Sequence, residues 1–400
     1  MATLELNRYR EYAPDGALDL LLRTAAQVRG RRFVHVNSTR VGGGVAEILH
    51  RMVPLMRELE VDAEWAVMDG DAEFFATTKS FHNALQGEAA ELTAPMLAHY
   101  LDVNRANARR LRLDGDLVLV HDPQPAPLIE SRPATGAWVW RCHIDLSAPS
   151  PGAWDFLKHY VNRYDRVVVS LESYARHATV PHVVVPPSID PLSEKNEPMG
   201  SDEITRGLRA VGVDLDKPLL VQVSRFDRFK DPVGVIAVYR LVKRRHDVRL
   251  VLVGGGATDD PEGVRVLAEV REAAGNDPDI HVLDLSPDSH RTINALQRAA
   301  TVVLQKSTRE GFGLTVAEAM WKGRPVIGGR VGGITVQILE GVTGYTVVTP
   351  EEAAARVCHL LTHPDEARAM GERGREHVRQ HFLVTRHLHD YLTLMLRLIG

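Results

Sequence analysis

Long apolar runs are missing from this 400-residue sequence, and cysteine and lysine are scarce. No stretch approaches the roughly 18 apolar residues that a membrane-spanning helix needs, so no transmembrane segment is predicted. The two cysteines, Cys142 and Cys358, cannot build a disulfide framework, and we interpret them as reduced, buried thiols. Lysine occurs only eight times, which by itself indicates nothing about partners. The chain has a net charge of −4 and its basic residues are dispersed, so a nucleic-acid partner is disfavoured.

Neither the N-terminal residues nor the main basic cluster indicates membrane targeting or membrane binding. Met1–Arg10 is charged and polar and lacks the apolar core of a signal peptide. The basic run Arg105, Arg109, Arg110 and Arg112 has no matching aromatic face, which favours a solvated helix over one that binds anionic lipid. We expect a cytoplasmic protein without stable membrane association.

The sequence does contain a repeated alternation of β-branched strands and helical segments. Its 400 residues exceed the roughly 250–300 over which one hydrophobic core grows, so two domains are expected. Near-continuous apolar strands that alternate with helices indicate parallel sheets covered on both faces, and hence an α/β fold of two doubly wound domains. The first set of predicted strands is Phe33–Val36, Ala63–Met68, Leu117–His121, Val139–Cys142, Val167–Ser170 and Val183–Val185. The second set is Leu219–Ser224, Arg249–Val253, His281–Asp284, Thr301–Leu304, Pro325–Gly328 and Gly344–Val348.

A proline-rich and polar stretch separates the two sets of strands. Pro186–Pro191 carries three prolines and Ser193–Asp202 has no apolar period, which is typical of an interdomain linker. We predict a first domain of residues 1–187 and a second of residues 188–380. Residues 381–400 form an amphipathic helix, which we expect to cross back and cover the first domain. Ligands of such sheets bind at the carboxyl ends of the strands, so the catalytic site is expected between the domains.

The most specific string follows the predicted strand at 301–304. It reads Gln305-Lys306-Ser307-Thr308-Arg309-Glu310-Gly311-Phe312-Gly313-Leu314-Thr315-Val316-Ala317-Glu318. The loop around Gly311 and Gly313 allows the backbone to approach a ligand closely, and the N–H groups of a helix start suit a diphosphate. Glu310, at the strand end, could hold sugar hydroxyls, and Glu318, further along the helix, could accept hydrogen bonds from a ribose. A lone glutamate in such a place is more often a solvated acid, but the whole string is more specific.

A second string follows the first strand of the second domain. It reads Val223-Ser224-Arg225-Phe226-Asp227-Arg228-Phe229-Lys230-Asp231-Pro232. Arg225 and Lys230 could neutralise a diphosphate, arginine through its planar fork and lysine as a point charge. A pair of surface cations is the alternative, and the position at a strand end argues against it.

Glycine-rich loops follow two other predicted strands. In Gly42-Gly43-Gly44, the residues Gly43 and Gly44 would let the loop approach a sugar phosphate in front of a helix N-terminus. The spacing differs from G-x-G-x-x-G and no acid for an adenosine ribose follows, which argues against a nicotinamide dehydrogenase. Gly254-Gly255-Gly256 is equally well explained as a tight turn or as a ligand contact.

Together, these strings resemble the retaining glycosyltransferases of family GT4, which have the GT-B fold of two Rossmann-like domains facing across a cleft. The two glutamates around Gly-Phe-Gly-Leu match the family motif, and the Arg/Lys pair has the family position. The resemblance implies that Glu310 contacts the donor sugar and Glu318 the ribose. It also implies that Arg225 and Lys230 stabilise the leaving diphosphate, and that Gly43, Gly44 and residues 311–314, including Phe312 and Leu314, border the donor.

Two further strings lie at strand ends of the first domain, where the acceptor is expected. They are Val120-His121-Asp122-Pro123-Gln124-Pro125 and Trp140-Arg141-Cys142-His143-Ile144-Asp145. The resemblance implies that His143 lies close to the reacting sugar, although the residues alone allow a satisfied core histidine equally well. Asp122, Gln124 and Arg141 are predicted acceptor contacts.

Within GT4, the chain resembles most the trehalose glycosyltransferring synthases, from about Val36 to Gly344. The segment that favours this branch, and that is expected to contact the acceptor, contains Lys79, His82, Asn83 and Gln86. The resemblance implies reversible, retaining transfer of glucose from an NDP-glucose to glucose, which gives α,α-trehalose. The stretch Leu283–Pro287 lacks the glycine that many GT4 members have near the nucleotide base, so the choice among ADP, UDP and GDP stays open.

Other functions stay open as well. A trehalose phosphorylase would use phosphate where the NDP sits, and another GT4 glucosyltransferase, of the sucrose type for example, would use a different small acceptor. A hydrolysing sugar-nucleotide epimerase or a non-catalytic sensor would share the architecture. The expected partners are a sugar and a nucleotide sugar, and a homodimer is left open.

No metal site and no tightly bound cofactor are predicted. Four Asp-x-Asp pairs fall in turns, and the pair His377 and His381 lacks a third ligand nearby. Mg²⁺ would enter only as the counter-ion of the nucleotide.

Overall fold

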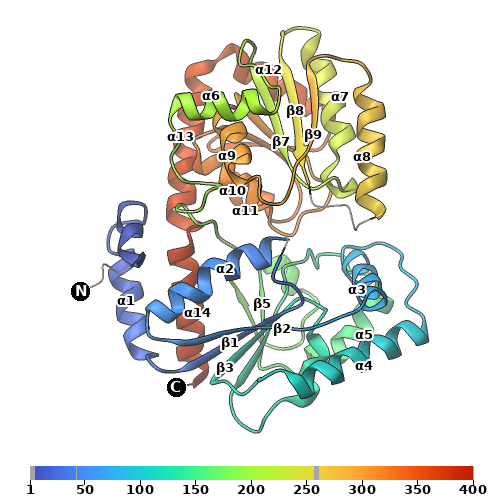
Figure 1. Cartoon of the computed structure of the whole chain (residues 1–400), viewed down its shortest axis with the longest axis vertical. Helices are drawn as coiled ribbons and strands as arrows, with labels where there is room; N and C mark the ends of the chain where they lie inside the picture. Colours follow the sequence, from blue (N-terminus) through green and yellow to red (C-terminus); the bar gives the residue numbers. More distant parts are fainter. Residues whose placement is uncertain (1–4, 42, 256–260, 400) are drawn as a thin grey trace. The chain divides into compact units, whose positions relative to one another are not determined.

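A computed structural model describes residues 5–41, 43–255 and 261–399 of the chain. The chain divides into two compact units, which we call the first domain (Met1–Ser188 with Val384–Gly400) and the second domain (Ile189–Leu383). The sequence places these boundaries after residues 187 and 380. Each domain contains one six-stranded sheet with parallel strands (Figure 1).

The sheet of the first domain has the strand order β2-β1-β3-β4-β5-β6, so the order reverses between β1 and β3. Its strands are β1 (Arg32–Asn37), β2 (Asp62–Val67), β3 (Leu117–His121), β4 (Ala137–Arg141), β5 (Arg166–Val169) and β6 (His182–Val184). Its α-helices are α1 (Ala17–Gln27), α2 (Gly43–Glu58), α3 (Ala72–Leu85), α4 (Ala94–Arg110), α5 (Pro151–Val161) and α14 (Val384–Ile399). Short 3₁₀ helices are η1 (Glu5–Glu11), η2 (Ala126–Ser131) and η3 (Glu172–Ala175).

Both faces of this sheet are covered, which explains why its central strands are apolar throughout. Every residue of β3 is buried. Val118 and Val120 pack in one core with Phe81 of α3 and Tyr100 of α4. Successive side chains of a strand point to opposite faces, so His121 lies on the other face of the sheet.

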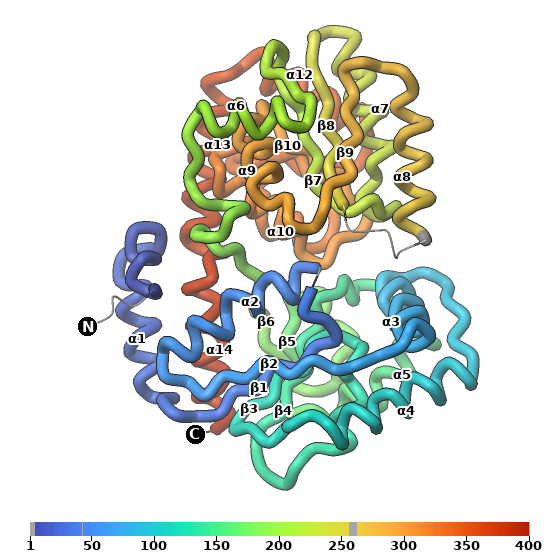
Figure 2. Tube along the Cα trace, viewed as in Figure 1, coloured from blue at the N-terminus to red at the C-terminus, as the bar shows by residue number. Residues whose placement is uncertain are grey.

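The final helix, α14, belongs to the first domain, as predicted. Its buried side chains recur at helical spacing and include Val384, Leu388, Leu392 and Met395. Burying one such side chain contributes roughly 1.5–3 kcal/mol. The Arg386 guanidinium donates hydrogen bonds of 2.7 and 3.0 Å to the carbonyl oxygens of Pro186 and Pro187. Figure 2 shows α14, in red, alongside α1, in blue.

The second domain has the strand order β12-β11-β10-β7-β8-β9, which is the Rossmann order with its reversal between β7 and β10. Its strands are β7 (Leu219–Val223), β8 (Arg249–Gly254), β9 (Ile280–Asp284), β10 (Val302–Gln305), β11 (Val326–Gly329) and β12 (Gly344–Val347). Its helices are α6 (Ser201–Ala210), η4 (Arg228–Lys230), α7 (Pro232–Lys243), α8 (Pro261–Ala274), α9 (His290–Ala299), α10 (Leu314–Trp321), α11 (Ile334–Gln337), α12 (Pro350–Thr362) and α13 (Pro364–His381).

All the predicted strands are confirmed, with ends that shift by at most two residues. The two domains divide between Ser188 and Ile189, within the proline-rich part of the predicted linker. Its polar part, 193–202, belongs to the second domain and is not a linker. Asn196 is buried, and its side-chain amide donates to the Asp190 carbonyl and to the Ser193 hydroxyl at 3.0 and 3.1 Å. The ammonium of Lys322, the residue that caps the C-terminal end of α10, donates to the Asn196 Oδ1 at 2.8 Å. Polar side chains bind this segment to the second domain, which apolar periodicity could not predict.

Across the described ranges, no helix is both long and apolar enough to cross a membrane.

Candidate active site

The reversal of strand order in the second domain brings two predicted site segments together. Strands β7 and β10 are neighbours, and the loops that follow them carry Lys230 and Glu310. The Lys230 Nζ donates to the Glu310 Oε2 at 2.7 Å. Ligands of doubly wound sheets bind outside the carboxyl ends of strands at such a reversal, so this ion pair lies where the fold places ligands.

The Glu310 carboxylate is held in a defined position. Its side chain is only 8% exposed, and a carboxylate so buried needs charged or hydrogen-bonding partners. Besides Lys230, the Ser307 hydroxyl donates to Oε2 at 3.1 Å. The Lys230 backbone is fixed in turn, because its carbonyl accepts a 2.7 Å hydrogen bond from the Gln222 side chain. The pair is therefore an ordered group and not two solvated charges.

Glycine is required beside Glu310. Gly313 has a φ of +84°, a conformation that side-chain-bearing residues rarely adopt, and a Cβ there would lie 3.2 Å from the Glu310 Cγ. Gly311 and Leu314, on either side of Phe312 and Gly313, are half-buried. The Phe312 ring is buried and packs edge-on against Phe382 with centroids 5.5 Å apart. The prediction that Phe312 borders the donor can therefore hold only for its backbone.

The carboxylate of Glu318 is buried in helix α10, with 2% of the side chain exposed. Its Oε1 lies 3.8 Å from the Lys195 Nζ, and its Oε2 has no hydrogen-bond partner among the described residues. A buried oxygen of this kind normally has a partner, and a ribose hydroxyl is a donor of the predicted kind. Glu318 is therefore not a solvated acid, although a lone glutamate in the sequence would suggest one.

Arg225 is more exposed, with 55% of its side chain open to solvent and Asp227 Oδ2 3.4 Å from its Nη2. A second ion pair joins the buried Lys306 to the half-buried Asp231, which follows Lys230 in the sequence. Asp231 has a φ of +50° and its carboxylate caps helix α7 through the Gly234 N–H at 3.0 Å.

In the first domain, Asp122 lies directly after β3, at that domain's own reversal of strand order. Its φ of +65° is uncommon for a residue with a side chain. The backbone N–H of His143, which follows the neighbouring strand β4, donates to the Asp122 Oδ1 at 2.7 Å. Burial raises the pKa of the Asp122 carboxyl to about 7, while this hydrogen bond and the charge of Arg141 lower it.

The His143 ring is half-buried and hydrogen-bonds through Nε2 to the Nδ1 of His121, at 3.0 Å. Burial and the charge of Arg141 hold the pKa of His143 well below its ordinary value, so the ring is neutral. The two predicted acceptor groups Asp122 and His143 thus form one hydrogen-bonded unit.

Arg141 does not lie where a direct acceptor contact was expected. Its side chain is fully buried, and the Nη2 donates to the Ser170 hydroxyl at 3.2 Å. Its Nε and Nη1 have no hydrogen-bond partner in the described part of the chain. Alternation along β4 places it on the sheet face opposite Trp138 and Trp140. Arg141 can act on a ligand through its charge rather than by contact.

All but one of the remaining predicted acceptor residues lie on helix α3 or cap its end. Lys79, His82 and Asn83 are half-buried, and the buried Gln86 caps the helix end. Their spacing of three, four and seven residues puts them on one helix face. Gln124 lies outside this helix, in the loop after Asp122, and its carbonyl accepts a 3.1 Å hydrogen bond from the Asn104 side chain.

The predicted glycines lie at loop-to-helix junctions. Gly43, with a φ of +77°, and Gly44 are exposed at the start of α2, whereas Gly42 and Gly256 lie outside the described residues. A Cβ on Gly255 would lie 1.6 Å from the Leu285 carbonyl oxygen. Close packing of two loops therefore explains this glycine without a ligand.

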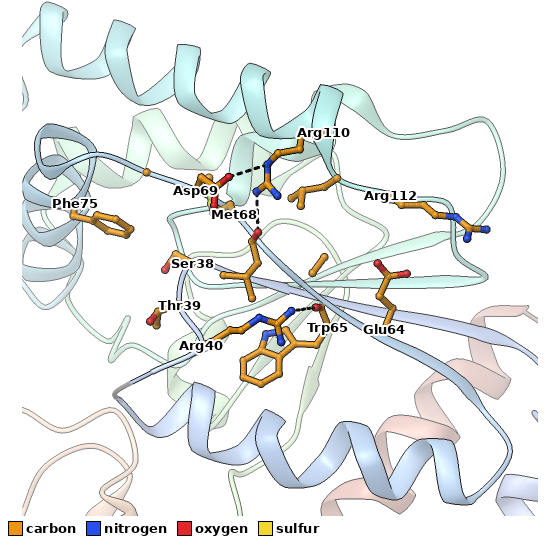
Figure 3. A pocket seen from close by; sticks show the side chains of 14 residues that line it. Ser38, Thr39, Arg40, Glu64, Trp65, Met68, Asp69, Phe75, Arg110 and Arg112 are labelled. Carbon is orange, nitrogen blue, oxygen red and sulfur yellow. Dashed lines mark hydrogen bonds and ion pairs between the residues drawn. The ribbon is translucent and has the colours of Figure 1, made fainter. Parts of the chain in front are cut away.

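A polar pocket of about 760 Å³ lies beside the edge strand β2 (Figure 3). Three arginines bind the outward carbonyls of this strand: Arg57 with Ala63 at 2.7 Å, Arg40 with Trp65 at 3.1 Å and Arg110 with Val67 at 2.9 Å. Arg40 and Arg110 also line the pocket, which includes none of the predicted acceptor residues. These arginines close the strand edge against further pairing.

Aspartates of the Asp-x-Asp pairs, to which we assign no metal, have other partners. Asp71 caps α3, and Asp116 accepts the Arg32 N–H at 2.8 Å. Asp279 pairs with Lys217 and Lys243 at 2.9 and 2.7 Å. No group of three potential metal ligands is found within the described residues.

Comparison of this sequence with known proteins shows its family. Residues 35–176 match the family described as "Trehalose synthase, N-terminal domain". Residues 205–377 match "Glycosyl transferases group 1". The chain is 48% identical to the trehalose synthase of Pyrococcus horikoshii, over 99% of this chain and 97% of that protein. It belongs to the trehalose synthase family.

The chain is also similar to another trehalose synthase and, less closely, to a trehalose phosphorylase. The trehalose synthase of Thermococcus litoralis is also 48% identical, over 98% of this chain and 96% of that protein. The trehalose phosphorylase of Pleurotus pulmonarius is 29% identical, over 94% of this chain but 58% of its own length.

Solved structures show the fold, which is GT-B. The sucrose-phosphate synthase of Thermosynechococcus elongatus superposes with a TM-score of 0.71 at 18% identity, over 92% of this chain and 99% of that one. The α,α-trehalose 6-phosphate synthase of Burkholderia multivorans superposes with a TM-score of 0.71 at 19% identity, over 92% and 98%.

Sequence reasoning singled out none of three buried polar residues: it missed His35, and it quoted His121 and Lys306 only within longer strings. His35 and His121 belong to apolar strands, and Lys306 follows one. A polar side chain inside or at the end of a fully buried strand is itself a signal, because burying it without a partner is costly. That signal was present in all three places.

Proposed function

We propose that the protein transfers glucose from an NDP-glucose to glucose, with retention at C1, to form α,α-trehalose and NDP in a reversible reaction. The observation that carries the proposal is the ordered Lys230–Glu310 pair at the reversal of strand order in the second domain. The 48% identity to proteins named trehalose synthase supports the choice of product. In this proposal, the second domain binds the nucleotide sugar and the first binds the acceptor.

The donor is proposed to bind through charge and hydroxyl contacts. Glu310 accepts hydrogen bonds from the glucose hydroxyls, and the free oxygen of Glu318 accepts one from the ribose. Lys230 and Arg225 attract the diphosphate, as do the N–H groups at the start of α10. These groups need no metal ligand from the chain, so we propose that Mg²⁺ enters only as a counter-ion of the nucleotide.

The transfer step is proposed to proceed on one face of the sugar. The bond between C1 and the diphosphate oxygen breaks as the acceptor hydroxyl forms its bond to C1, and the acceptor proton passes to the leaving phosphate. Positive charge near the diphosphate stabilises the developing negative charge. The chain then supplies position and charge, and no covalent intermediate forms.

The direct test is incubation of the purified protein with glucose and, separately, ADP-, UDP- or GDP-glucose, with and without inorganic phosphate. We expect trehalose and NDP in equal amounts, independent of phosphate. An α,α-linked product from an α-linked donor shows retention. Nucleotide release without trehalose would contradict the acceptor, and trehalose cleavage that depends on phosphate would favour a phosphorylase, which the likeness to the Pleurotus enzyme makes the second candidate.

The role of the ordered pair is tested by Glu310→Gln, with Glu351→Gln as control. Glutamine removes the charge that pairs with Lys230, and we expect transfer to fall by roughly 100-fold or more. Glu351 is an exposed glutamate in the first turn of α12 of the same domain, so its variant should keep wild-type activity. Full activity of Glu310→Gln would overturn the assignment.

A further inference from the structure

A chain of three histidine rings runs through the first domain and ends at His143. The Nδ1 of His35 lies 3.1 Å from the Nε2 of His121, and the Nδ1 of His121 lies 3.0 Å from the Nε2 of His143. Successive ring centroids are 5.4 and 5.3 Å apart. The chain thus links a fully buried residue in strand β1 to a predicted site residue.

The sheet brings these rings together. His35 lies in β1 and His121 ends the neighbouring strand β3, while His143 follows β4, which pairs with β3. Each neighbour pair is joined by one ring-to-ring hydrogen bond. His143 therefore has its Nε2 occupied by His121, which leaves Nδ1 as the ring nitrogen that can meet a substrate.

All three rings are neutral in the folded chain. Burial lowers the pKa of His35 to about 3 and holds those of His121 and His143 well below the ordinary value. A neutral imidazole has one N–H and one lone pair, and each ring-to-ring hydrogen bond uses one of each. Only two arrangements of protons along the chain are then consistent with both bonds.

The two arrangements differ at the ends of the chain. In one, His35 carries its N–H on Nε2 and His143 presents a lone pair on Nδ1. In the other, His35 keeps a lone pair on Nε2 and His143 presents an N–H on Nδ1. The Nε2 of His35 is buried and has no hydrogen-bond partner in the described part of the chain. Buried N–H groups without a partner are rarer than buried acceptors without one, which selects the second arrangement.

We propose that His121 and His35 are positioning residues that hold His143 with its proton on Nδ1, so that His143 gives a hydrogen bond to a sugar oxygen. The proposal rests on the proposed function for the identity of the sugar. The partner of one ring nitrogen decides the protonation of the other. His143 then has no lone pair with which to take the acceptor proton, and this agrees with transfer of that proton to the leaving phosphate.

The deciding experiment is a nitrogen-detected NMR measurement of the full chain labelled with ¹⁵N-histidine, assigned with His143→Asn. We expect the signals of a protonated Nδ1 and an unprotonated Nε2 for His143 in the wild-type protein. A protonated Nε2, or an averaged pair of signals, would overturn the proposal. This measurement needs no turnover, so its outcome is independent of whether the protein makes trehalose.

Variants at His121 test the link between the rings. His121→Leu removes the partner of His143, and we expect averaged His143 signals and a kcat for glucose transfer reduced by roughly 10-fold with a smaller change in KM. In His121→Asn, the side-chain amide can occupy the position of the His121 Nδ1 and donate to the His143 Nε2. Compared with His121→Leu, both the His143 signals and kcat should therefore recover in part.

His387→Leu is the matched control for the His121 variants. His387 is also fully buried in the first domain, but its Nδ1 is bonded to the Ser188 hydroxyl at 2.9 Å, outside the chain of rings. We expect His387→Leu to leave the His143 signals unchanged. Unchanged His143 signals in His121→Leu would contradict the proposal, and if that variant fails to fold, the wild-type and His121→Asn spectra still decide it.

Discussion

Replacing Asp122 with asparagine should stabilise the folded protein at neutral and alkaline pH. The Asp122 carboxyl is held by the His143 N–H at 2.7 Å, and burial raises its pKa to about 7 from an ordinary 3.8. An amide oxygen can accept the same hydrogen bond without ever carrying a charge. The substitution therefore removes the cost of ionising a buried group and leaves the local contact in place.

The sign and size of the effect follow from proton linkage. Between about pH 4 and pH 7 the unfolded chain gives up the Asp122 proton while the folded chain keeps it, which stabilises the unfolded state. Stability due to this group is thus present below about pH 4 and lost as the pH rises to 7. A difference of about three pKa units corresponds to about 4 kcal/mol. Because the Asp122 side chain is half-buried, we reduce this to about 2 kcal/mol.

Calorimetric unfolding of both proteins at about pH 4.5 and about pH 8 tests this reasoning. We expect similar midpoints at the lower pH and a midpoint higher by roughly 4–8 °C for Asp122→Asn at the higher pH. Asp145→Asn is the control, because the buried Asp145 carboxylate also accepts one backbone N–H, that of Ser147 at 2.9 Å. A pH dependence of stability that is the same in wild type and Asp122→Asn would refute the argument.

Three further substitutions probe other contacts. Lys230→Met removes the charge paired with Glu310, and we expect glucose transfer, measured as released NDP, to fall by roughly 100-fold or more. Gly313→Ala forces a side chain to a φ of +84° and against Glu310, which should cost about 1–2 kcal/mol in urea unfolding and lower kcat. Asp279→Asn should cost roughly 3 kcal/mol, because it leaves the Lys217 and Lys243 ammonium groups without their buried partner. Burial would raise the pKa of Asp279, but the two lysines outweigh it and hold it at about 2, so this stability should be present above about pH 4 and lost as the pH falls to 2.

Matched substitutions separate these effects from general damage. Lys158→Met alters a half-buried lysine of helix α5 and should leave transfer unchanged. Gly275→Ala strains the backbone at a φ of +63° with no atom within 4 Å of the new Cβ, so it should lower stability but not kcat. Asp247→Asn removes an exposed partner of the same two lysines and should cost less stability than Asp279→Asn. Equal losses of transfer activity in the lysine pair or in the glycine pair, or equal losses of stability in the aspartate pair, would contradict the corresponding prediction.

The strands and their loops could be predicted because their causes are local. A strand such as Leu117–His121, buried on both faces, needs apolar residues throughout, and that run is visible in the sequence. The helix start at Gly313 is similarly local, since glycine tolerates the left-handed backbone that the turn requires. The segment around Asn196 could not be predicted in this way, because polar contacts with distant residues hold it and leave no periodic pattern.

The sequence by itself determined the alternation of strands and helices, the parallel sheets and the polar residues that follow each strand, because burial and turn geometry act over neighbouring residues. Only the tertiary structure decided which strand ends lie side by side. The neighbouring positions of β7 and β10 bring Lys230 to Glu310 across 80 residues of chain. The order of β1, β3 and β4 likewise joins His35, His121 and His143 into one chain of rings. Strand order results from packing of the whole sheet, and no local pattern records it.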